Sequence, residues 1–389
     1  MGGGGLSDAP WQQRAAAAVA GFTSTRSKGP DAMFGGPPDD GRTHMARAAG
    51  ARVWTADGRE LLDWTMALGA VALGYAHPAV VEAVTRAARD GMVGPLPPVH
   101  EVELAERLAT VYPGAGQARF FKTGAEAVAA AVRLARVATG RRRVVHCGYH
   151  GWLDGPTGGA GVPRDVSELW RAVPFGDIPA LEVAMDEAPA ALLVEPVVER
   201  EPPKAWLAAT RDLTRAHHAV LIFDEIKTAF RVARGGAAER WGVAPDLGVL
   251  GKAMANGAPL AAVVGRADLM ARVRDTWISS TLATEFTALA AAAAVLDVWD
   301  TEDVAAHLRR TGKALIDGLP AGPWTVAGMP EMSMLRFTDE DVERRFLAAV
   351  RERGVLLKRG AYNFPSLAHG DAEVRTTLEA VRGALETVA

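Results

Sequence analysis

The 389-residue chain has few cysteines and little net charge, and each scarcity excludes a class of protein. Its single cysteine, Cys147, cannot form a disulfide within the chain, so a disulfide-rich secreted domain is excluded and the reducing cytoplasm is the expected location. The 43 lysines and arginines nearly balance the 46 aspartates and glutamates. The resulting formal charge of −3 gives no general attraction for nucleic acid or an anionic membrane, so neither is expected as a partner.

Long apolar runs are missing as well. The Ala-rich segment "FTALAAAAAVLDVW" has 14 residues, which is fewer than the roughly 18 of a membrane span, and it is typical of a buried helix. The N-terminal "MGGGG" is neither a signal peptide nor a myristoylation motif, because Leu6 stands where Ser or Thr is needed, so a loose tail is expected. The basic run "GRRRVV" is too short for a nucleic-acid footprint and is interpreted as a solvated turn. Cys147 comes shortly after the apolar pair Val144 and Val145 and is expected to be buried and unreactive.

What the chain does have is enough apolar residues, 49%, for a sizeable core. From about residue 78, helical patterns alternate with short continuous apolar runs, which favours a mostly parallel sheet covered by helices on both faces. The expected strands are 117–124, 142–148, 190–197, 219–225 and 245–252, and the expected helices are 78–91, 101–114, 125–140 and 205–218. The predicted fold class is therefore α/β.

Three regions are predicted from these patterns. Residues 1–50 are expected to form an N-terminal arm that is irregular from residue 6, because "GPDAMFGGPPDDGR" is rich in Gly, Pro and Asp. Residues 51–295 form the large domain, which starts with a hairpin that turns at Asp57-Gly58. Residues 296–389 form a smaller α+β domain, to which the arm also contributes.

The stretch "LIFDEIKTAFR" at 221–231 raises the question of function. A buried apolar strand runs directly into two acids, Asp224 and Glu225. Either both carboxylates lie in water past the strand end, or a buried cation waits for one of them. Ligands of open parallel sheets bind outside the carboxyl ends of strands, so the second reading predicts a site there.

Three further features fall at such strand ends. Thr123 precedes Glu126 by three residues, which is a capping box, and the first turn of the helix leaves backbone N–H groups open to an anion. Tyr149 and His150, in "CGYHGW", form either a packed loop or a platform for a planar ligand. Lys252 ends "VLGK" among small residues; it either extends to solvent or is a desolvated nucleophile.

One ligand accounts for all four features. Pyridoxal 5′-phosphate (PLP) needs a lysine for its Schiff base, a carboxylate that keeps its ring nitrogen protonated, a helix N-terminus for its phosphate and an aromatic face over its ring. On this hypothesis Asp224 is the partner of the ring nitrogen, which gives the buried acid a reason.

The stretches "LIFDEIKTAFRVARGG" and "WGVAPDLGVLGKAMANGAPLAAVVG" resemble the signature of class III (omega-type) aminotransferases of PLP fold type I, D-E-V-x-T-G-F-R followed by P-D-L-x-x-x-G-K. The resemblance runs from about residue 45 to the C-terminus. It includes "GARVWTADGRELLDW", "LGYAHPAV", "EVELAERL", "TGAEA", "GYHGW", "VEP" and "SLAHGDAEV". Within the class the chain is most similar to the branch of glutamate-1-semialdehyde 2,1-aminomutase and its aminotransferase relatives.

The resemblance implies a role for each matching position. Lys252 matches the Schiff-base lysine and Asp224 the partner of the ring nitrogen. Ile226 and Tyr149 match the residues on the two faces of the ring, with His150 beside them. The remaining matches are Thr123, Gly124 and Ala125 for the phosphate turn, Thr281 for a phosphate contact from the other subunit of a homodimer, and Glu195 for the acid of the E-P stretch.

The departures from the family pattern are informative too. Ala125 lacks the hydroxyl common at the third phosphate position, so backbone N–H groups and Thr281 would carry more of the anchoring. Ala229 replaces a signature glycine, with little expected effect. Around Thr281 the aminomutase pattern Q-A-G-T-L-S-G-N-P is absent, which argues against retention of a diamine intermediate. A second reading of Thr281 is that it caps the Ala-rich helix.

The leading prediction is a PLP-dependent aminotransferase that works by ping-pong chemistry on a small-molecule amino donor and a carbonyl acceptor, with Lys252 as both Schiff base and proton shuttle. An aminomutase is the alternative, followed by a PLP decarboxylase or racemase. A non-catalytic protein is disfavoured because the cofactor residues are all present. Candidates for substrate contacts are Arg26, Arg200 and Trp64.

Overall fold

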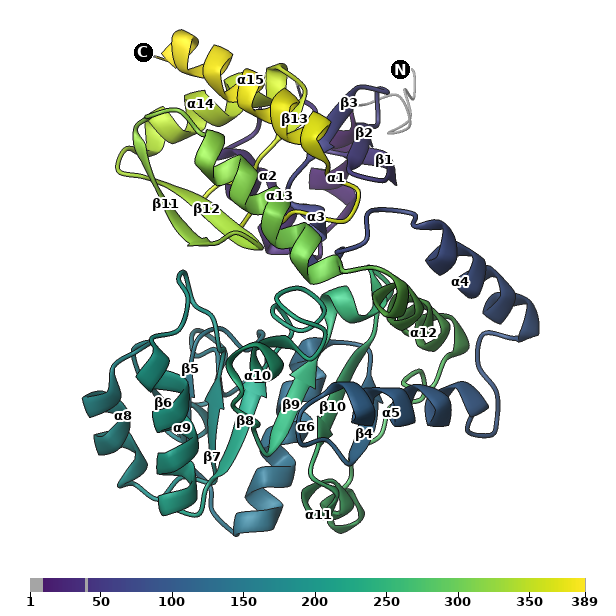
Figure 1. Cartoon of the computed structure of the whole chain (residues 1–389), viewed down its shortest axis with the longest axis vertical. Helices are drawn as coiled ribbons and strands as arrows, with labels where there is room; N and C mark the ends of the chain where they lie inside the picture. Colours follow the sequence, from purple (N-terminus) through teal and green to yellow (C-terminus); the bar gives the residue numbers. More distant parts are fainter. Residues whose placement is uncertain (1–9, 39–40, 389) are drawn as a thin grey trace, which may run out of the picture. The chain divides into compact units, whose positions relative to one another are not determined.

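The computed structural model of the chain describes residues 10–38 and 41–388 (Figure 1). The predicted loose tail "MGGGG" lies outside the described residues. By their internal contacts the described residues form two units. One spans Pro78–Ala306, and the other joins the residues up to His77 to those from His307 onward. The larger unit thus begins at residue 78 and ends at residue 306, whereas the large domain was predicted to span residues 51–295.

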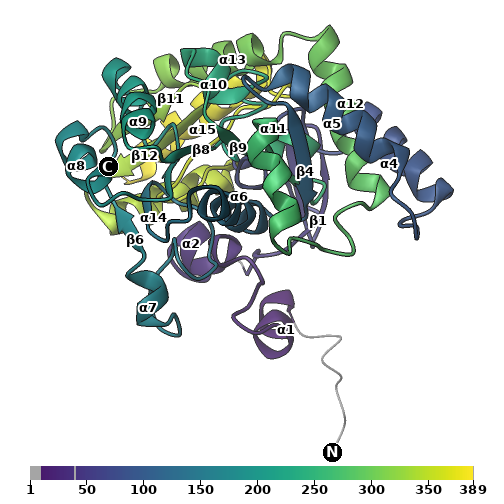
Figure 2. The same ribbon diagram turned by 90° about the horizontal axis from the view of Figure 1, so that it is seen from below.

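The larger unit contains a seven-stranded sheet, shown from two directions in Figures 1 and 2. Its order is β4 (Gln117–Phe121), β10 (Ala261–Gly265), β9 (Leu247–Leu250), β8 (Val220–Asp224), β7 (Ala191–Val194), β5 (Val144–Cys147) and β6 (Trp170–Ala172). From β9 to β6 all neighbours are parallel, which confirms the predicted mostly parallel sheet. Because β10 is antiparallel to both β4 and β9, β4 runs in the same direction as β9. The carboxyl ends of six strands therefore lie along one edge.

Helices cover both faces of this sheet. Helix α6 (Gly124–Thr139) packs on one face, where alternate strand residues such as Leu193, Ile222 and Val263 point towards it. The remaining helices include α4 (Pro78–Asp90), α5 (Val99–Val111), α8 (Ile178–Met185), α9 (Lys204–Ala216), α10 (Gly236–Trp241) and α12 (Phe286–Thr301). The short α7 (Arg164–Ser167) and α11 (Ala267–Met270) complete the set. In the part of the chain that the structure describes, no helix has the length and apolar character to cross a membrane.

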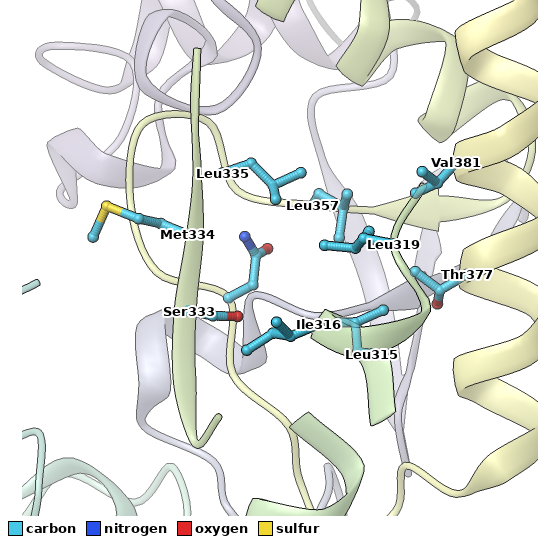
Figure 3. A pocket seen from close by; sticks show the side chains of 10 residues that line it. Leu315, Ile316, Leu319, Ser333, Met334, Leu335, Leu357, Thr377 and Val381 are labelled. Atoms are coloured by element: carbon cyan, nitrogen blue, oxygen red, sulfur yellow. The ribbon is translucent and has the colours of Figure 1, made fainter. Parts of the chain in front are cut away.

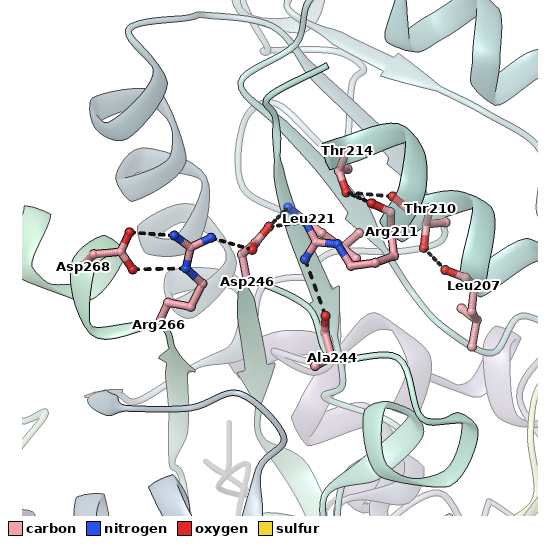
Figure 4. Close-up of polar contacts among 9 residues, drawn as sticks. All are labelled: Leu207, Thr210, Arg211, Thr214, Leu221, Ala244, Asp246, Arg266 and Asp268. Atoms are coloured by element: carbon pink, nitrogen blue, oxygen red, sulfur yellow. Dashed lines mark hydrogen bonds and ion pairs between the residues drawn. The ribbon is translucent and has the colours of Figure 1, made fainter. Parts of the chain in front are cut away.

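A charged network fixes the end of the sheet opposite to the carboxyl ends (Figure 4). The Oδ2 atom of Asp246, directly before β9, accepts from the backbone N–H of Leu221 at 2.8 Å and from Arg211 at 2.9 Å. Its Oδ1 accepts from Arg266 at 3.1 Å, and Arg266 also pairs with Asp268. The aspartate of the "PDL" signature thus stabilises strand ends that are remote from the predicted site.

The smaller unit is built on a four-stranded sheet, in the order β1 (Met45–Ala49), β2 (Arg52–Thr55), β3 (Glu60–Asp63) and β13 (Val355–Leu356). The predicted hairpin at Asp57-Gly58 is the connection between β2 and β3. Strand β3 pairs in parallel with β13, so the N-terminal segment and the C-terminal segment share one sheet. This pairing is why the hairpin belongs to the smaller unit. The unit also contains strands β11 (Trp324–Met329) and β12 (Met332–Phe337) and helices α3 (Met66–Gly69), α13 (Val304–Gly318), α14 (Glu340–Glu352) and α15 (Asp371–Val388).

The prediction that the arm is irregular is wrong in part. Helices α1 (Trp11–Ala18) and α2 (Pro30–Phe34), with the 3₁₀ turn Arg26–Lys28, lie within it. Pro30 stands at the first position of α2, where its missing N–H costs nothing, and Gly35 ends the helix with a φ of 76°. These two residues mark a helix start and stop in a stretch whose glycine and proline content suggested a loop.

A cavity in this unit is lined by side chains from β12, α13 and α15, among them Met334, Leu315 and Val381 (Figure 3). Its volume of about 20 Å³ leaves room for about one water molecule. It is a gap in side-chain packing and too small for a substrate or a cofactor.

Candidate active site

Five carboxyl ends on one edge of the large sheet carry the residues that the sequence singled out. In the order of the strands they are Thr123 after β4, Lys252 after β9, Asp224 at the end of β8, Glu195 after β7, and Tyr149 with His150 after β5. The fold therefore brings together side chains that are up to 129 residues apart in the chain, from 123 to 252.

Lys252 begins a short 3₁₀ turn, Lys252–Ala255, directly after Gly251. Its φ of 48° lies in the left-handed region, which costs a non-glycine residue about 1–3 kcal/mol and is typical of functional sites. The Lys252 amine makes no hydrogen bond or ion pair with any residue that the structure describes. Burial lowers its pKa to about 8, and the nearby charge of Lys227 acts in the same direction. Lys252 is thus a partly buried amine that is neutral more often than an ordinary lysine.

The two acids after β8 point to different partners. The Oδ2 atom of Asp224 lies 2.8 Å from Nδ1 of His150, and its Oδ1 accepts from the backbone N–H of Ile226 at 3.2 Å. Glu225 instead accepts from the backbone N–H groups of Ala237 and Ala238, both at 2.8 Å. Burial raises the pKa of Glu225 to about 7. Glu225 therefore supports the start of α10, and Asp224 is the acid that faces the site.

The turn after β4 forms the predicted capping box. The Thr123 hydroxyl oxygen accepts from the backbone N–H of Glu126 at 3.2 Å, and the Glu126 carboxylate accepts from the backbone N–H of Thr123 at 2.8 Å. This leaves the N–H groups of Gly124 and Ala125 without an acceptor among the described residues. Gly124 has no room for a side chain, since a Cβ there would lie 2.4 Å from Cδ1 of Ile226. Two open N–H groups at the N-terminus of a 16-residue helix favour an anion.

The loop after β5 lies against this turn. A Cβ on Gly151 would come within 2.8 Å of the Cβ of Ala125, so the loop packs closely on the turn. The backbone N–H of Tyr149 donates to Oε2 of Glu195 at 3.2 Å, while the residue as a whole is 68% exposed. An exposed ring on an anchored backbone is free to lie over a planar ligand. Cys147 is buried as expected, and burial raises the pKa of its thiol to about 12.

Lys227 is a charged residue of this edge that the sequence reading missed. Its ammonium pairs with Oε1 of Glu195, and both side chains are almost buried. The available signal was its position in "DEIKTAFR", three residues after a buried strand end. A charge so close to a core strand requires a partner, but the sequence does not identify Glu195 as that partner.

Thr281 lies in the irregular segment between Asp275 and α12, and its side chain is exposed. The reading of Thr281 as the cap of α12 is wrong. The cap is Glu285, which accepts from the backbone N–H groups of Thr287 and Ala288 at 2.7 and 2.9 Å. Glu285 also pairs with Lys122, the residue before the capping box, at 2.7 Å. The segment is thereby fastened to the β4 end of the site.

The three candidates for substrate contacts are divided between the two units. Arg200 is in the larger unit, where it donates to the carbonyl oxygen of Phe175 at 3.2 Å. Arg26 is exposed on the 3₁₀ turn of the smaller unit. Trp64 is completely buried in the core of that unit, and its Nε1 donates to Thr377 at 2.7 Å. Its place in the structure is that of a core residue.

Comparison with known proteins agrees with this geometry. The sequence model described as Aminotransferase class-III matches residues 37–385. Among solved structures, the FumI protein of Sphingopyxis sp. MTA144, in its PLP internal aldimine form, is 26% identical over 97% of this chain and 95% of that chain, with a TM-score of 0.92. An omega-transaminase from Sphaerobacter thermophilus is 27% identical over 97% of both chains, with a TM-score of 0.86.

A glutamate-1-semialdehyde-aminomutase from Pseudomonas aeruginosa PAO1 is also similar in structure. It is 24% identical over 97% of this chain and 94% of that chain, with a TM-score of 0.86. At this identity the likeness concerns the fold.

Proposed function

The chain belongs to the class III aminotransferase family, and we propose that Lys252 is its reactive lysine and Asp224 the carboxylate that holds a proton on the ring nitrogen of the cofactor. The protein is an aminotransferase, and its cofactor is PLP. The observation that carries the proposed roles is the amine of Lys252, which has no hydrogen-bond or ion-pair partner among the described residues and lies at the carboxyl edge of the sheet, one strand away from Asp224.

The residues of this edge fit PLP. Its phosphate needs donors without acceptors, and the backbone N–H groups of Gly124 and Ala125 are such donors. Its aldehyde needs an amine that is partly neutral, and the pKa of Lys252 is lowered to about 8. Its ring nitrogen needs a buried carboxylate, and Asp224 is 3% exposed. Ile226 contacts Gly124 and Gly251, and so links the phosphate turn to the residue before the lysine.

When bound, PLP supplies an electron sink for the carbanion that forms at the substrate carbon. The chain's own residues position the reacting groups and transfer the proton. Nζ of Lys252 acts as the proton shuttle: it takes a proton from the substrate carbon and delivers it to the cofactor carbon that receives the amino group. A base works best in this role when its pKa is close to the working pH, and the pKa of Lys252 is lowered to about 8. Asp224, paired with His150, keeps negative charge where a ring proton needs it. Glu195 holds the backbone of Tyr149, whose ring would lie over the cofactor.

The proposal includes a homodimer in the cytoplasm, in which Thr281 contacts the phosphate held by the partner subunit. Its support is the exposed side chain of Thr281 in a segment fastened by Lys122 and Glu285, together with the missing hydroxyl at Ala125. The support for the cytoplasm is the single cysteine.

A half-reaction experiment tests the proposed activity. The PLP-loaded protein is mixed with a panel of amino donors, without any acceptor, and both the cofactor and the solution are analysed. An aminotransferase converts its cofactor to the amine form and releases one free keto product per site. An aminomutase, racemase or decarboxylase on the same fold releases no keto acid or aldehyde from the donor in stoichiometric amount, and that result would refute the proposal.

A further inference from the structure

Two almost buried side chains of opposite charge act electrostatically on the amine of Lys252 and take no part in the proposed proton transfer. Lys227 and Glu195 form an ion pair in which the side chains are only 10% and 12% exposed. Burying two charges is costly and is offset only where the geometry is good and further hydrogen bonds are made. Glu195 makes one such bond, to the backbone N–H of Tyr149 at 3.2 Å.

The pair connects two parts of the site. Glu195 follows β7 and is packed against the loop after β5, since a Cβ on Gly148 would lie 2.4 Å from the Cβ of Glu195. Lys227 follows β8, three residues after Asp224. The ion pair therefore joins the loop that carries Tyr149 to the segment that carries Asp224.

Four charged groups act on the amine of Lys252. Glu195 and Asp224, at the ends of β7 and β8, favour its protonated form, whereas Lys227 and Arg231, on the segment after β8, oppose it. Of the four, Lys227 has the strongest effect, and burial acts in its direction. An ammonium so close to the reactive amine makes a second positive charge there unfavourable.

We propose that Lys227 is a positioning residue, which through its ion pair with Glu195 fixes the Tyr149 loop and through its own charge favours the neutral, nucleophilic form of Lys252. The proposal rests on the proposed function only in taking Lys252 as the reactive amine. It predicts that Lys227 and Glu195 shift the pKa of Lys252 in opposite directions.

The direction follows from the charges. Lys227→Met removes the opposing cation and leaves Glu195 to attract a proton to Lys252, so the pKa of Lys252 rises by about one pH unit. Glu195→Gln leaves the Lys227 cation without its anion, so the pKa of Lys252 falls by about the same amount. The double variant removes both charges and lies between the single variants. A pair that merely packs would not produce shifts of opposite sign.

The test is competitive acetylation of the full-length chain without PLP, at pH 6 to 10, with Lys252 quantified by peptide mass spectrometry. Its pH midpoint is read for the wild type, the two single variants, the double variant and Lys227→Arg, which keeps the charge. Lys313→Met is the matched control, because Lys313 forms an exposed ion pair with Asp317 in the smaller unit. The pH midpoint of the visible absorbance of the PLP-loaded protein is the second readout.

We expect opposite shifts in the single variants, a midpoint near that of the wild type in Lys227→Arg, and no change in Lys313→Met. Unchanged midpoints in the single variants, or shifts of the same sign, would overturn the proposal. Thermal unfolding identifies a variant that does not fold, and the sign of the shift in the other single variant then decides. The labelling result is independent of transaminase activity, so its failure is distinct from failure of the proposed function.

Discussion

Nδ1 of His150 lies 2.8 Å from Oδ2 of Asp224, while Nε2 of the same ring lies 3.1 Å from the carbonyl oxygen of Cys147. A carbonyl oxygen only accepts, so Nε2 carries a proton. The contact on the other side then needs a second proton between Nδ1 and the carboxylate. The His150 ring thus holds Asp224 in place through Oδ2, and both side chains are buried. Among the described residues Oδ1 of Asp224 accepts only from the backbone N–H of Ile226, at 3.2 Å, and so keeps a lone pair for the site.

Asp224→Asn is expected to keep some PLP bound and to lower turnover by orders of magnitude. The amide has about the same shape, but it cannot hold a proton on the ring nitrogen, so the electron sink is weakened. Turnover and PLP content are measured on the same preparation. Asp268→Asn, an exposed change at the opposite edge of the sheet, is the control. Near-normal turnover of Asp224→Asn would remove the proposed role.

Lys252→Ala is expected to abolish the covalent attachment of PLP and the visible absorption band that comes with it. The amine of Lys252 has no hydrogen-bond or ion-pair partner among the described residues. Borohydride reduction of the wild type, followed by peptide mapping, locates the pyridoxyl group. Its recovery on Lys227, or on any lysine other than Lys252, contradicts the assignment.

The rate at which the PLP-free chain captures PLP is expected to rise with pH and to level off above about pH 8. Only the neutral amine attacks the aldehyde, and the pKa of Lys252 is lowered to about 8 by burial and by Lys227. Below this pKa the neutral fraction rises about tenfold per pH unit, and above it the fraction approaches one. Stopped-flow absorbance between pH 6 and 10 measures the profile. A rate that still climbs steeply at pH 10 would mean an ordinary lysine.

The sheet was predictable because each central strand is a continuous apolar run, and such runs indicate strands buried on both faces. The positions of Asp224 and Lys252 at strand ends were predictable, because a charge directly after a buried apolar strand needs a partner or a ligand. The division into units was less predictable. It depends on the pairing of β3 (Glu60–Asp63) with β13 (Val355–Leu356), and pairing between segments so far apart in the chain leaves no local sequence signal. The same holds for Lys227, whose partner Glu195 lies 32 residues earlier, on another strand.

Lys122→Met is expected to loosen the segment that carries Thr281. Lys122 donates to Glu285 at 2.7 Å and to the carbonyl oxygen of Pro259 at 3.2 Å, so it holds the start of α12 against the loop before β10. Faster proteolysis between Asp275 and Glu285 is the measurement. Lys313→Met serves as the control, and an unchanged cleavage rate in Lys122→Met would show that the pair is not needed to order the segment.

Thr281→Ala is expected to weaken PLP binding without loss of helix stability. A hydrogen bond to a charged phosphate is worth about 1.5–3 kcal/mol, and about 1.4 kcal/mol corresponds to a factor of ten, so the loss is about tenfold to a hundredfold. Because Glu285 caps α12, the variant keeps its cap and its thermal unfolding is expected to stay near that of the wild type. Thr284→Ala, in the same segment, is the matched control.

Sedimentation of the same variants separates the two ways in which Thr281 could fail. If Thr281 contacts the phosphate of the partner subunit, Thr281→Ala remains a dimer and loses PLP affinity, while dilution of the wild type below its dimer dissociation constant lowers affinity by a similar factor. A variant that binds PLP as tightly as Thr284→Ala would refute the contact. A wild type that is monomeric and fully active would remove the premise of a shared site, and the open N–H groups of Gly124 and Ala125 would then have to hold the phosphate within one chain.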